Sequence, residues 1–109
     1  MIDIEMQSFR GILFVRLSGK LTRQSINTLN KEVIKLVKKV GIKNIVFNLQ
    51  GINEIDKYGE NILFKSMNLC LSNKGQMLIC ASNSQVTDKI SEKIKIVNDE
   101  LTAVHLINS

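Results

Sequence analysis

The feature that most constrains the fold of this chain is the alternation of two hydrophobic patterns along its length. Short apolar runs typical of buried strands occur at Ile12–Leu17, Ile45–Leu49 and Met77–Ala81. Between these runs, apolar residues recur at spacings of three and four, as they do on one face of an amphipathic helix. Strands that alternate with helices form parallel sheets with right-handed crossovers, so the sequence predicts an α/β fold.

The N-terminal segment departs from this alternation. Ile2, Ile4 and Met6 alternate with polar residues, which predicts a half-buried strand. Residues 8–11 form a hairpin connection in which Gly11 can take a positive φ, and the second strand ends at residues 18–19. We therefore expect a mixed sheet of order ββαβαβαβα, in which an N-terminal antiparallel hairpin precedes the parallel later strands.

The first predicted helix begins after Thr22, a suitable N-cap, and ends before Gly41. Its apolar face carries Ile26, Leu29, Val33, Leu36, Val37 and Val40. Its other face carries Lys31, Lys35, Lys38 and Lys39, which we interpret as solvent-exposed residues.

A loop is predicted over Gly51–Lys57, and Asp56 is expected to cap a second long helix that ends at Gly75. The apolar side of this helix carries Ile62, Leu63, Ser66, Met67 and Cys70. Phe64 and Leu71 flank and widen it, either as core packing or as a contact surface. A short helix follows from residues 82–84 to about Ser91, and the last strand is Ile94–Val97. Asp99 would cap a final helix whose apolar residues are Leu101, Val104 and either Leu106 or Ile107.

Length and composition limit the functions that this chain can have. Its 109 residues suit one domain, 1–109, and its apolar runs are too short to cross or insert into a membrane. The N-terminus has no signal-peptide pattern, and two cysteines suit free thiols, so we expect a cytoplasmic protein. The net charge of +5 partly reflects Lys from A/T-rich codons, and the aromatic residues are scattered, which disfavours specific nucleic-acid binding.

The sequence contains no catalytic constellation that we can identify. His105 is the only histidine, which excludes a Ser-His triad or a histidine metal site. Cys70 and Cys80 have no CxxC spacing, and no stretch matches a glycine-rich phosphate loop. Glu54, Asp56 and Glu60 cluster near a helix start, where capping explains them, although a carboxylate metal site is the alternative. We therefore predict neither enzymatic activity nor a cofactor.

The most distinctive segment is residues 48–59, where a buried strand leads into a helix. Such a connection places side chains at the C-terminal edge of a parallel sheet, where α/β folds present their functional groups. The helix start also offers unpaired N–H groups that suit an anion or a carboxylate of a partner.

Four stretches together resemble the STAS domain of bacterial anti-sigma-factor antagonists, and the resemblance covers nearly the whole chain. They are Leu17–Thr22, Ile45–Asn53, Ile55–Gly59 and Gly75–Cys80, in the order and spacing of that family. The resemblance implies a βα superhelix without enzymatic activity. It also implies binding to an anti-sigma factor that is a GHKL-type kinase, or to a related ATPase, with release of the sigma factor. In that family the kinase phosphorylates a serine or threonine at the start of the second helix.

The chain departs from the family pattern where this phosphorylated residue would lie. Lys57 and Tyr58 replace a serine pair, and the phospho-acceptor position is occupied by Tyr58. A tyrosine hydroxyl lies several ångströms further from the backbone than that of serine, so a kinase aligned for serine should not reach it. Glu60 and Asn61 also replace small or apolar residues. The resemblance then implies docking without the usual switch, or a surface remade by Lys57 and Tyr58 for a different partner.

The expected partner-binding residues come from three connections at one end of the domain. They are Thr22, Arg23, Gln24, Ser25, Glu54, Asp56, Lys57, Tyr58, Ser82, Asn83 and Ser84. Phosphorylation of another hydroxyl, such as that of Ser25 or Ser84, is left open. An alternative function is a STAS subunit of a lipid-transport ABC system, which packs on the cytoplasmic ATPase and needs no phospho-acceptor. A small-ligand or nucleotide binder is a third class, disfavoured because no phosphate loop is present.

Overall fold

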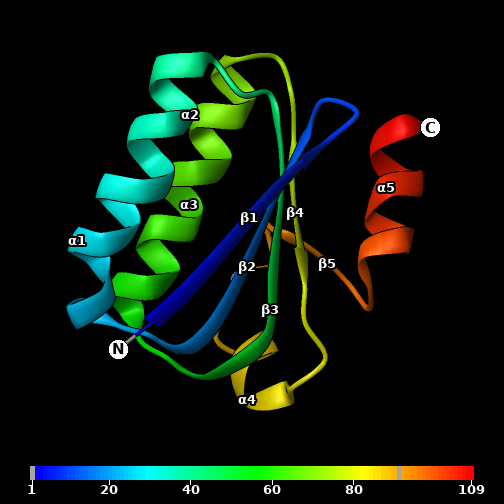
Figure 1. Ribbon diagram of the computed structural model, residues 1–109. Coiled ribbons are helices and arrows are strands. Elements are labelled where there is room, and N and C mark those ends of the chain that lie inside the picture. Colours follow the sequence, from blue (N-terminus) through cyan, green and yellow to red (C-terminus); the bar gives the residue numbers. More distant parts are fainter. Residues whose placement is uncertain (1, 91) are drawn as a thin grey trace.

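The computed structural model describes residues 2–90 and 92–109, which form one five-stranded sheet with helices on both faces (Figure 1). The strands are β1 (Ile2–Phe9), β2 (Ile12–Leu21), β3 (Asn44–Ile55), β4 (Met77–Cys80) and β5 (Lys95–Val97), and they lie in that order across the sheet. β1 is antiparallel to β2, and every later pairing is parallel. The predicted α/β class and mixed sheet are therefore confirmed.

Four helical regions surround the sheet (Figure 1). The first comprises a 3-10 turn (Arg23–Ser25), α1 (Ile26–Leu29), a π-helical turn (Asn30–Ile34) and α2 (Lys35–Val40). The others are α3 (Lys57–Ser72), α4 (Ser84–Thr87) and α5 (Glu100–Asn108). α1, α2 and α3 lie on one face, α5 lies on the other, and the short α4 lies at the lower end of the sheet. In the described part of the chain, no helix has the length and apolar character that crossing a bilayer requires.

The hairpin between β1 and β2 turns through Arg10 and Gly11, whose φ angles are 50° and 79°. Two consecutive positive φ angles are the requirement of the two-residue turn that matches the twist of paired strands. The predicted role of Gly11 is confirmed.

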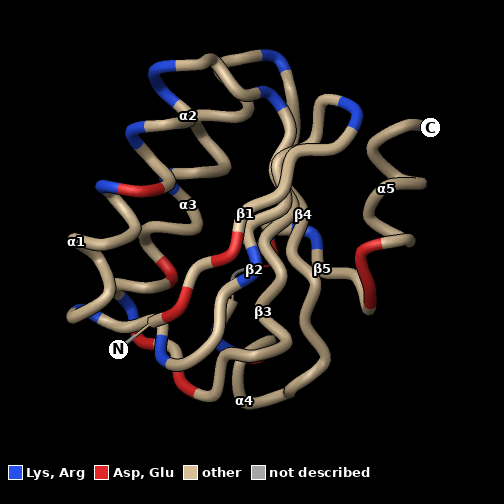
Figure 2. Tube along the Cα trace, in the orientation of Figure 1, with Lys and Arg blue, Asp and Glu red and all other residues tan. Residues whose placement is uncertain are grey.

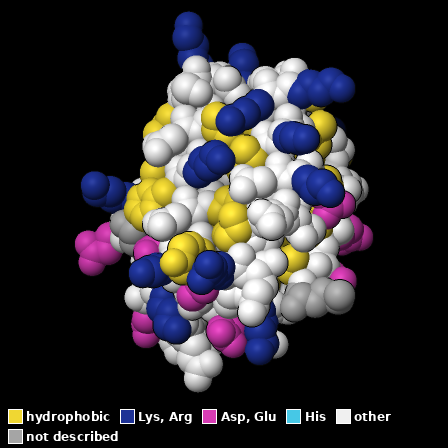
Figure 3. Space-filling view, turned by 90° about the vertical axis from the view of Figure 1, so that its left-hand side faces the viewer, with side chains coloured by type: hydrophobic (Ala, Val, Ile, Leu, Met, Phe, Trp, Pro, Cys, Tyr) yellow, Lys and Arg dark blue, Asp and Glu magenta, His cyan; other side chains and the backbone are white. Residues whose placement is uncertain are grey.

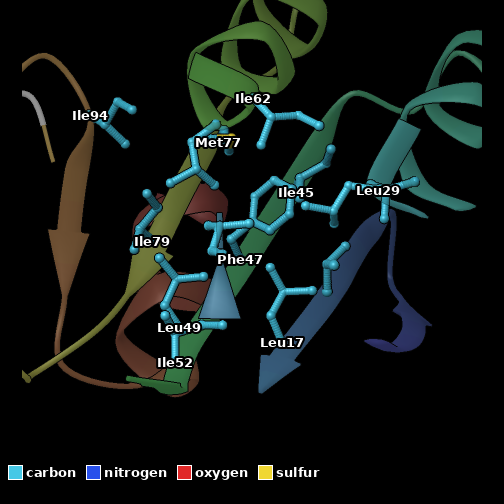
Figure 4. Close-up of a cluster of buried hydrophobic side chains, with 14 of the residues drawn as sticks. Leu17, Leu29, Ile45, Phe47, Leu49, Ile52, Ile62, Met77, Ile79 and Ile94 are labelled. Carbon is cyan, nitrogen blue, oxygen red and sulfur yellow. The ribbon is translucent and has the colours of Figure 1, made fainter. Parts of the chain in front are cut away.

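The core has two parts because the central strands are buried on both faces. The larger part lies under α1, α2 and α3, where Phe47, Leu17 and Ile79 of adjacent strands meet Leu29 and Ile62 of the helices (Figure 4). The smaller part lies under α5 and consists of Ile12, Phe14, Val46, Leu78, Cys80, Val97 and Ala103. Cys70 and Cys80 are both buried free thiols, as predicted.

The loop predicted over residues 51–57 is wrong, because β3 continues to Ile55 and pairs with an equally extended β2. The pairing shows two register shifts, and at each of them β3 contains one residue more than β2. Each added residue is a bulge that displaces the alternation of side chains by one position. Leu49, Ile52 and Ile55 are therefore spaced by three but all point into the larger core.

Some apolar residues are more exposed than their helical spacing predicts. Val40, Leu71 and Leu101 are exposed, and Ala103, Val104 and Ile107 form the inner side of α5 instead. Leu101 is therefore not part of the side of α5 that faces the sheet.

The short helix that follows β4 is α4, and it ends at Thr87. Ser91, its predicted end, lies outside the described residues. The four lysines predicted on the outer face of the first helical region are exposed, as expected.

Candidate functional site

The three predicted connections meet at the lower end of the sheet, where β2, β3 and β4 end (Figure 1). Hydrogen bonds join the connections to one another and to neighbouring strands. The amide of Arg23 donates to Asp56 at 3.0 Å, and the hydroxyl of Ser82 donates to Gln50 at 3.0 Å. The structure thus brings together the segments that sequence reasoning selected.

Asp56 holds two of these connections with one carboxylate. It is the N-cap of α3, and its Oδ1 accepts from the amide of Gly59 at 2.9 Å, while its Oδ2 accepts from the amide of Arg23. Burial disfavours the charged carboxylate, but the hydrogen bonds from these amides outweigh that effect. The pKa of Asp56 therefore lies below its ordinary value. The predicted cap is confirmed, and the link to the first helical region is an addition to it.

Gly59 lets the start of α3 approach the end of β2 closely. A Cβ atom at this position would lie only 2.1 Å from the carbonyl oxygen of Leu21. The same carbonyl accepts from the amide of Asp56 at 3.3 Å. Only glycine fits this contact without displacement of the backbone, so Gly59 fixes where α3 begins.

Tyr58 is the exposed aromatic residue of this end, with 41% of its surface accessible. The guanidinium of Arg23 lies 5.7 Å from the ring centroid and the ammonium of Lys57 lies 5.4 Å from it. Cation–π attraction at these distances favours a defined ring position while leaving part of the ring available. An exposed tyrosine flanked by two cations suits an apolar and acidic patch of a protein partner.

Not all predicted contact residues present their side chains to solvent. Thr22 and Ser25 are buried, and the Ser25 hydroxyl donates to the carbonyl of Lys20 and accepts from the amide of Thr22. These two residues shape the start of the first helical region instead of forming its surface. Gln24 and Glu54 are exposed, and Glu54 forms an ion pair of 3.5 Å with Lys20.

The third connection is held by side chains that sequence reasoning did not select. Gln50 accepts from Ser82 and donates to the carbonyl of Asn98 at 2.7 Å, while Lys89 reaches the carbonyl of Ile55 at 3.4 Å. Asn83, which was selected, caps α4 by accepting from the amide of Gln85, and Ser82 and Ser84 are exposed. Gln50 lies within the distinctive segment and could have been selected as its exposed strand residue.

The groups that could carry reactive chemistry are dispersed. Burial raises the pKa of the Cys70 and Cys80 thiols to about 11, so both remain protonated at neutral pH. His105 is exposed on α5, at the face opposite α3. Across residues 2–90 and 92–109, no three His, Cys, Asp or Glu side chains come close enough to hold a metal ion. The arrangement at the lower end of the sheet is suited to contact with another macromolecule.

Solved structures of anti-sigma factor antagonists share this fold. The chain matches a putative antagonist from Thermotoga maritima with a TM-score of 0.89 and 14% identity, over 97% of this chain and 95% of that chain. It matches the antagonist SpoIIAA in its unphosphorylated form with a TM-score of 0.80 and 12% identity, over 100% of this chain and 99% of that one. At these identities the likeness shows the fold alone.

The chain belongs to the STAS family, because the model of the STAS domain matches residues 3–103. An anti-sigma F factor antagonist from Paenibacillus polymyxa is 27% identical over 85 residues, which are 78% of this chain and 73% of that protein. The resemblance inferred from the sequence is therefore confirmed. These relatives do not favour the alternative of a subunit in a lipid-transport system.

Proposed function

We propose that this chain is a non-enzymatic binding module that captures an anti-sigma factor and thereby frees the sigma factor. The observation that carries the proposal is Tyr58, exposed at the start of α3 and held between Arg23 and Lys57. The resemblance to the family puts its phosphorylated turn at this position, and the name of the Paenibacillus relative as an anti-sigma F factor antagonist also supports the proposal. The partner is an anti-sigma factor of the GHKL kinase type or a related ATPase.

The docking surface is formed by the exposed members of the three connections. These are Arg23, Gln24, Glu54, Lys57, Tyr58, Ser82, Asn83 and Ser84. Asp56, Thr22 and Ser25 lie beneath or beside them and fix the backbone through the hydrogen bonds described above, and Asn83 also caps α4. Tyr58 is the expected anchor, since a rigid aromatic residue contributes contact area at a low cost in side-chain entropy.

Binding by this surface operates without a serine switch at the start of α3. The hydroxyl of Tyr58 lies at the far end of the aromatic ring, further from the backbone than a serine hydroxyl would. Ser25, the serine of the first helical region, is buried. Ser82 and Ser84 are exposed but belong to another connection. Under this proposal the module stays competent to bind in the presence of the kinase and ATP.

Calorimetric titration with purified anti-sigma F factor, the kind of protein that the Paenibacillus relative antagonises, tests the proposed capture. We expect Tyr58→Ala to weaken binding at least tenfold, the effect of about 1.4 kcal/mol for a lost anchor. Leu101→Ala is the matched control, since Leu101 is exposed on α5 at the opposite face. No binding by the unaltered chain at high micromolar concentration would refute the proposal.

Intact mass measured after incubation with the kinase and ATP tests the absence of the switch. We expect no added phosphate on the unaltered chain, whereas Tyr58→Ser restores a hydroxyl at the distance that the kinase requires. Phosphate on Tyr58→Ser, with weaker binding after incubation with ATP than before it, would support the assignment of position 58, because removal of the Tyr58 ring already weakens binding by itself. Phosphorylation of the unaltered chain with loss of binding would contradict it.

A further inference from the structure

A groove runs between the first helical region and α3, on the face turned to the viewer in Figure 3. Three adjoining depressions of about 490, 180 and 480 Å³ form it, and Lys65 lines all of them. The groove begins beside Tyr58, which lines the smallest depression together with Ile26 and Ile62. It reaches Lys38 and Leu69 at its other end. It is thus continuous with the docking surface proposed above.

The charge of this groove is of one sign. Its described lining contains Lys31, Lys35, Lys38 and Lys65 and no acidic residue. Glu32 and Glu60 are the acidic residues of these helices, and neither lines the depressions. In Figure 3 the Lys and Arg side chains gather on the upper part of this face, and Figure 2 shows several of them along α2.

These lysines have little to neutralise them within the molecule. Lys65 donates to the side chain of Asn30 across the groove at 3.4 Å, which leaves its charge uncompensated. Lys31, Lys35 and Lys38 form no ion pair within the residues that the structure describes. The positive potential of the groove is therefore available to a partner of opposite charge.

The lining between the lysines is apolar and amide-bearing. Ile34 and Ile62 are buried in the helices, and Phe64 and Leu69 are half-buried beside them. Figure 3 shows hydrophobic side chains between the blue ones on this face. A groove with apolar lining and charged edges fits the apolar stripe and charged flanks of an amphipathic helix. A phosphate backbone would gain little from the apolar lining, which favours a peptide over a nucleic acid.

The π-helical turn Asn30–Ile34 coincides with the centre of the groove. Asn30, Lys31 and Ile34 belong to this turn and all line the largest depression. A π-turn widens a helix locally and is less favourable than regular α-helix, and such turns occur frequently at functional positions. The irregular turn therefore places a lysine and an amide at the edges of the groove.

We propose that this groove binds an acidic amphipathic helix of the partner that contacts Tyr58, an inference that rests on the proposed function. Between Tyr58 and Leu69, α3 advances by about 17 Å, so about three turns of a partner helix would fill the groove. The apolar stripe of that helix packs against the half-buried Phe64 and Leu69, and its carboxylates face the four lysines.

An NMR titration with a designed peptide tests the groove without the natural partner. The probe is an acidic amphipathic peptide of about 14 residues, or four helical turns, rich in Leu and Glu. The controls are a peptide of the same composition in scrambled order and a single-stranded DNA of similar charge. We expect shifts of the side-chain amides of Asn30, Asn61 and Asn68 with the amphipathic peptide alone. Equal binding of the scrambled peptide or of DNA, or no shift at millimolar peptide, would refute the proposal.

Charge reversal distinguishes the groove from the docking surface. The double variant Lys35→Glu with Lys65→Glu should bind both the peptide and the anti-sigma F factor at least fivefold more weakly than the unaltered chain does. Added salt should reduce this difference in affinity. Lys43→Glu with Lys95→Glu changes the net charge equally at exposed lysines outside the groove, and should have little effect.

The two proposals fail in different ways. If Tyr58→Ala weakens binding of the anti-sigma factor but the variant with Lys35→Glu and Lys65→Glu binds it normally, the groove proposal is refuted and the proposed function stands. If the anti-sigma factor does not bind the unaltered chain, the proposed function is refuted, and the peptide titration still decides the groove.

Discussion

Removal of the Asp56 carboxylate is the perturbation whose cost the structure defines most clearly. Asp56→Ala deletes the cap of α3, worth about 1 kcal/mol, and also the bond from the Arg23 amide. That second bond is charge-assisted but close to solvent, so it adds about 1 kcal/mol instead of the larger value of a buried one. We expect a loss of about 2 kcal/mol in the free energy of unfolding.

Urea unfolding followed by circular dichroism measures this loss. With an m value of about 1 kcal/mol per molar urea, the midpoint should fall by about 2 M, and m should not change. Asp99→Ala is the matched control, because Asp99 caps α5 by accepting from the amide of Thr102 at 2.8 Å, within its own helix. Asp99→Ala should lower the free energy of unfolding by less than Asp56→Ala does. If Asp56→Ala is no more harmful than Asp99→Ala, the bond to Arg23 contributes nothing and the reasoning is wrong.

Three further predictions concern Asp56, Gly59 and the two buried thiols. Since the pKa of Asp56 is lowered in the folded state, its stabilisation is present above its unfolded pKa of about 4 and is lost as pH falls through the folded pKa. Unfolding measured at decreasing pH should therefore show a smaller acid loss in Asp56→Asn than in the unaltered chain. Gly59→Ala should destabilise the protein by at least about 2 kcal/mol, because its Cβ would overlap the Leu21 carbonyl, and a smaller loss in urea unfolding would contradict this contact. The buried thiols of Cys70 and Cys80, with pKa values of about 11, should react with a thiol reagent at pH near 8 only after unfolding, and rapid reaction of the native protein would contradict their burial.

The sequence predicted most of the fold because the relevant signals are local. The apolar runs of β2, β3 and β4, the positive φ at Gly11 and the caps Asp56 and Asp99 depend on residues that are neighbours in the chain. Each of these features is confirmed. They determine the order of strands and helices, and the order with right-handed crossovers largely determines the sheet.

The extension of β3 was missed because its signal is not local. Two bulges change the spacing of buried residues from two to three at Leu49, Ile52 and Ile55, and the sequence alone then resembles a loop. Which strand carries the added residues depends on pairing with β2. In the same way, the exposure of Leu101 depends on which side of α5 packs against the sheet.

The sequence predicted where the candidate site lies, but it did not predict the contacts between the side chains and backbones that form it. That three connections share one end follows from parallel topology. The burial of Thr22 and Ser25, and the bond between Arg23 and Asp56, depend on how two turns pack together, which no pattern in either turn specifies. The groove is a property of two helices packed side by side, and the lysines that line it resemble an ordinary solvated face in the sequence.

The double role of Asp56 bears on the thermodynamics of association. Because one carboxylate joins the turn before α3 to the turn before the first helical region, both turns are already in their final shape before any partner arrives. A partner then loses little affinity to the ordering of these backbones, and complementarity of shape decides which proteins bind. The entropy of association should accordingly be that of two rigid bodies, with no contribution from loop folding at this end of the sheet.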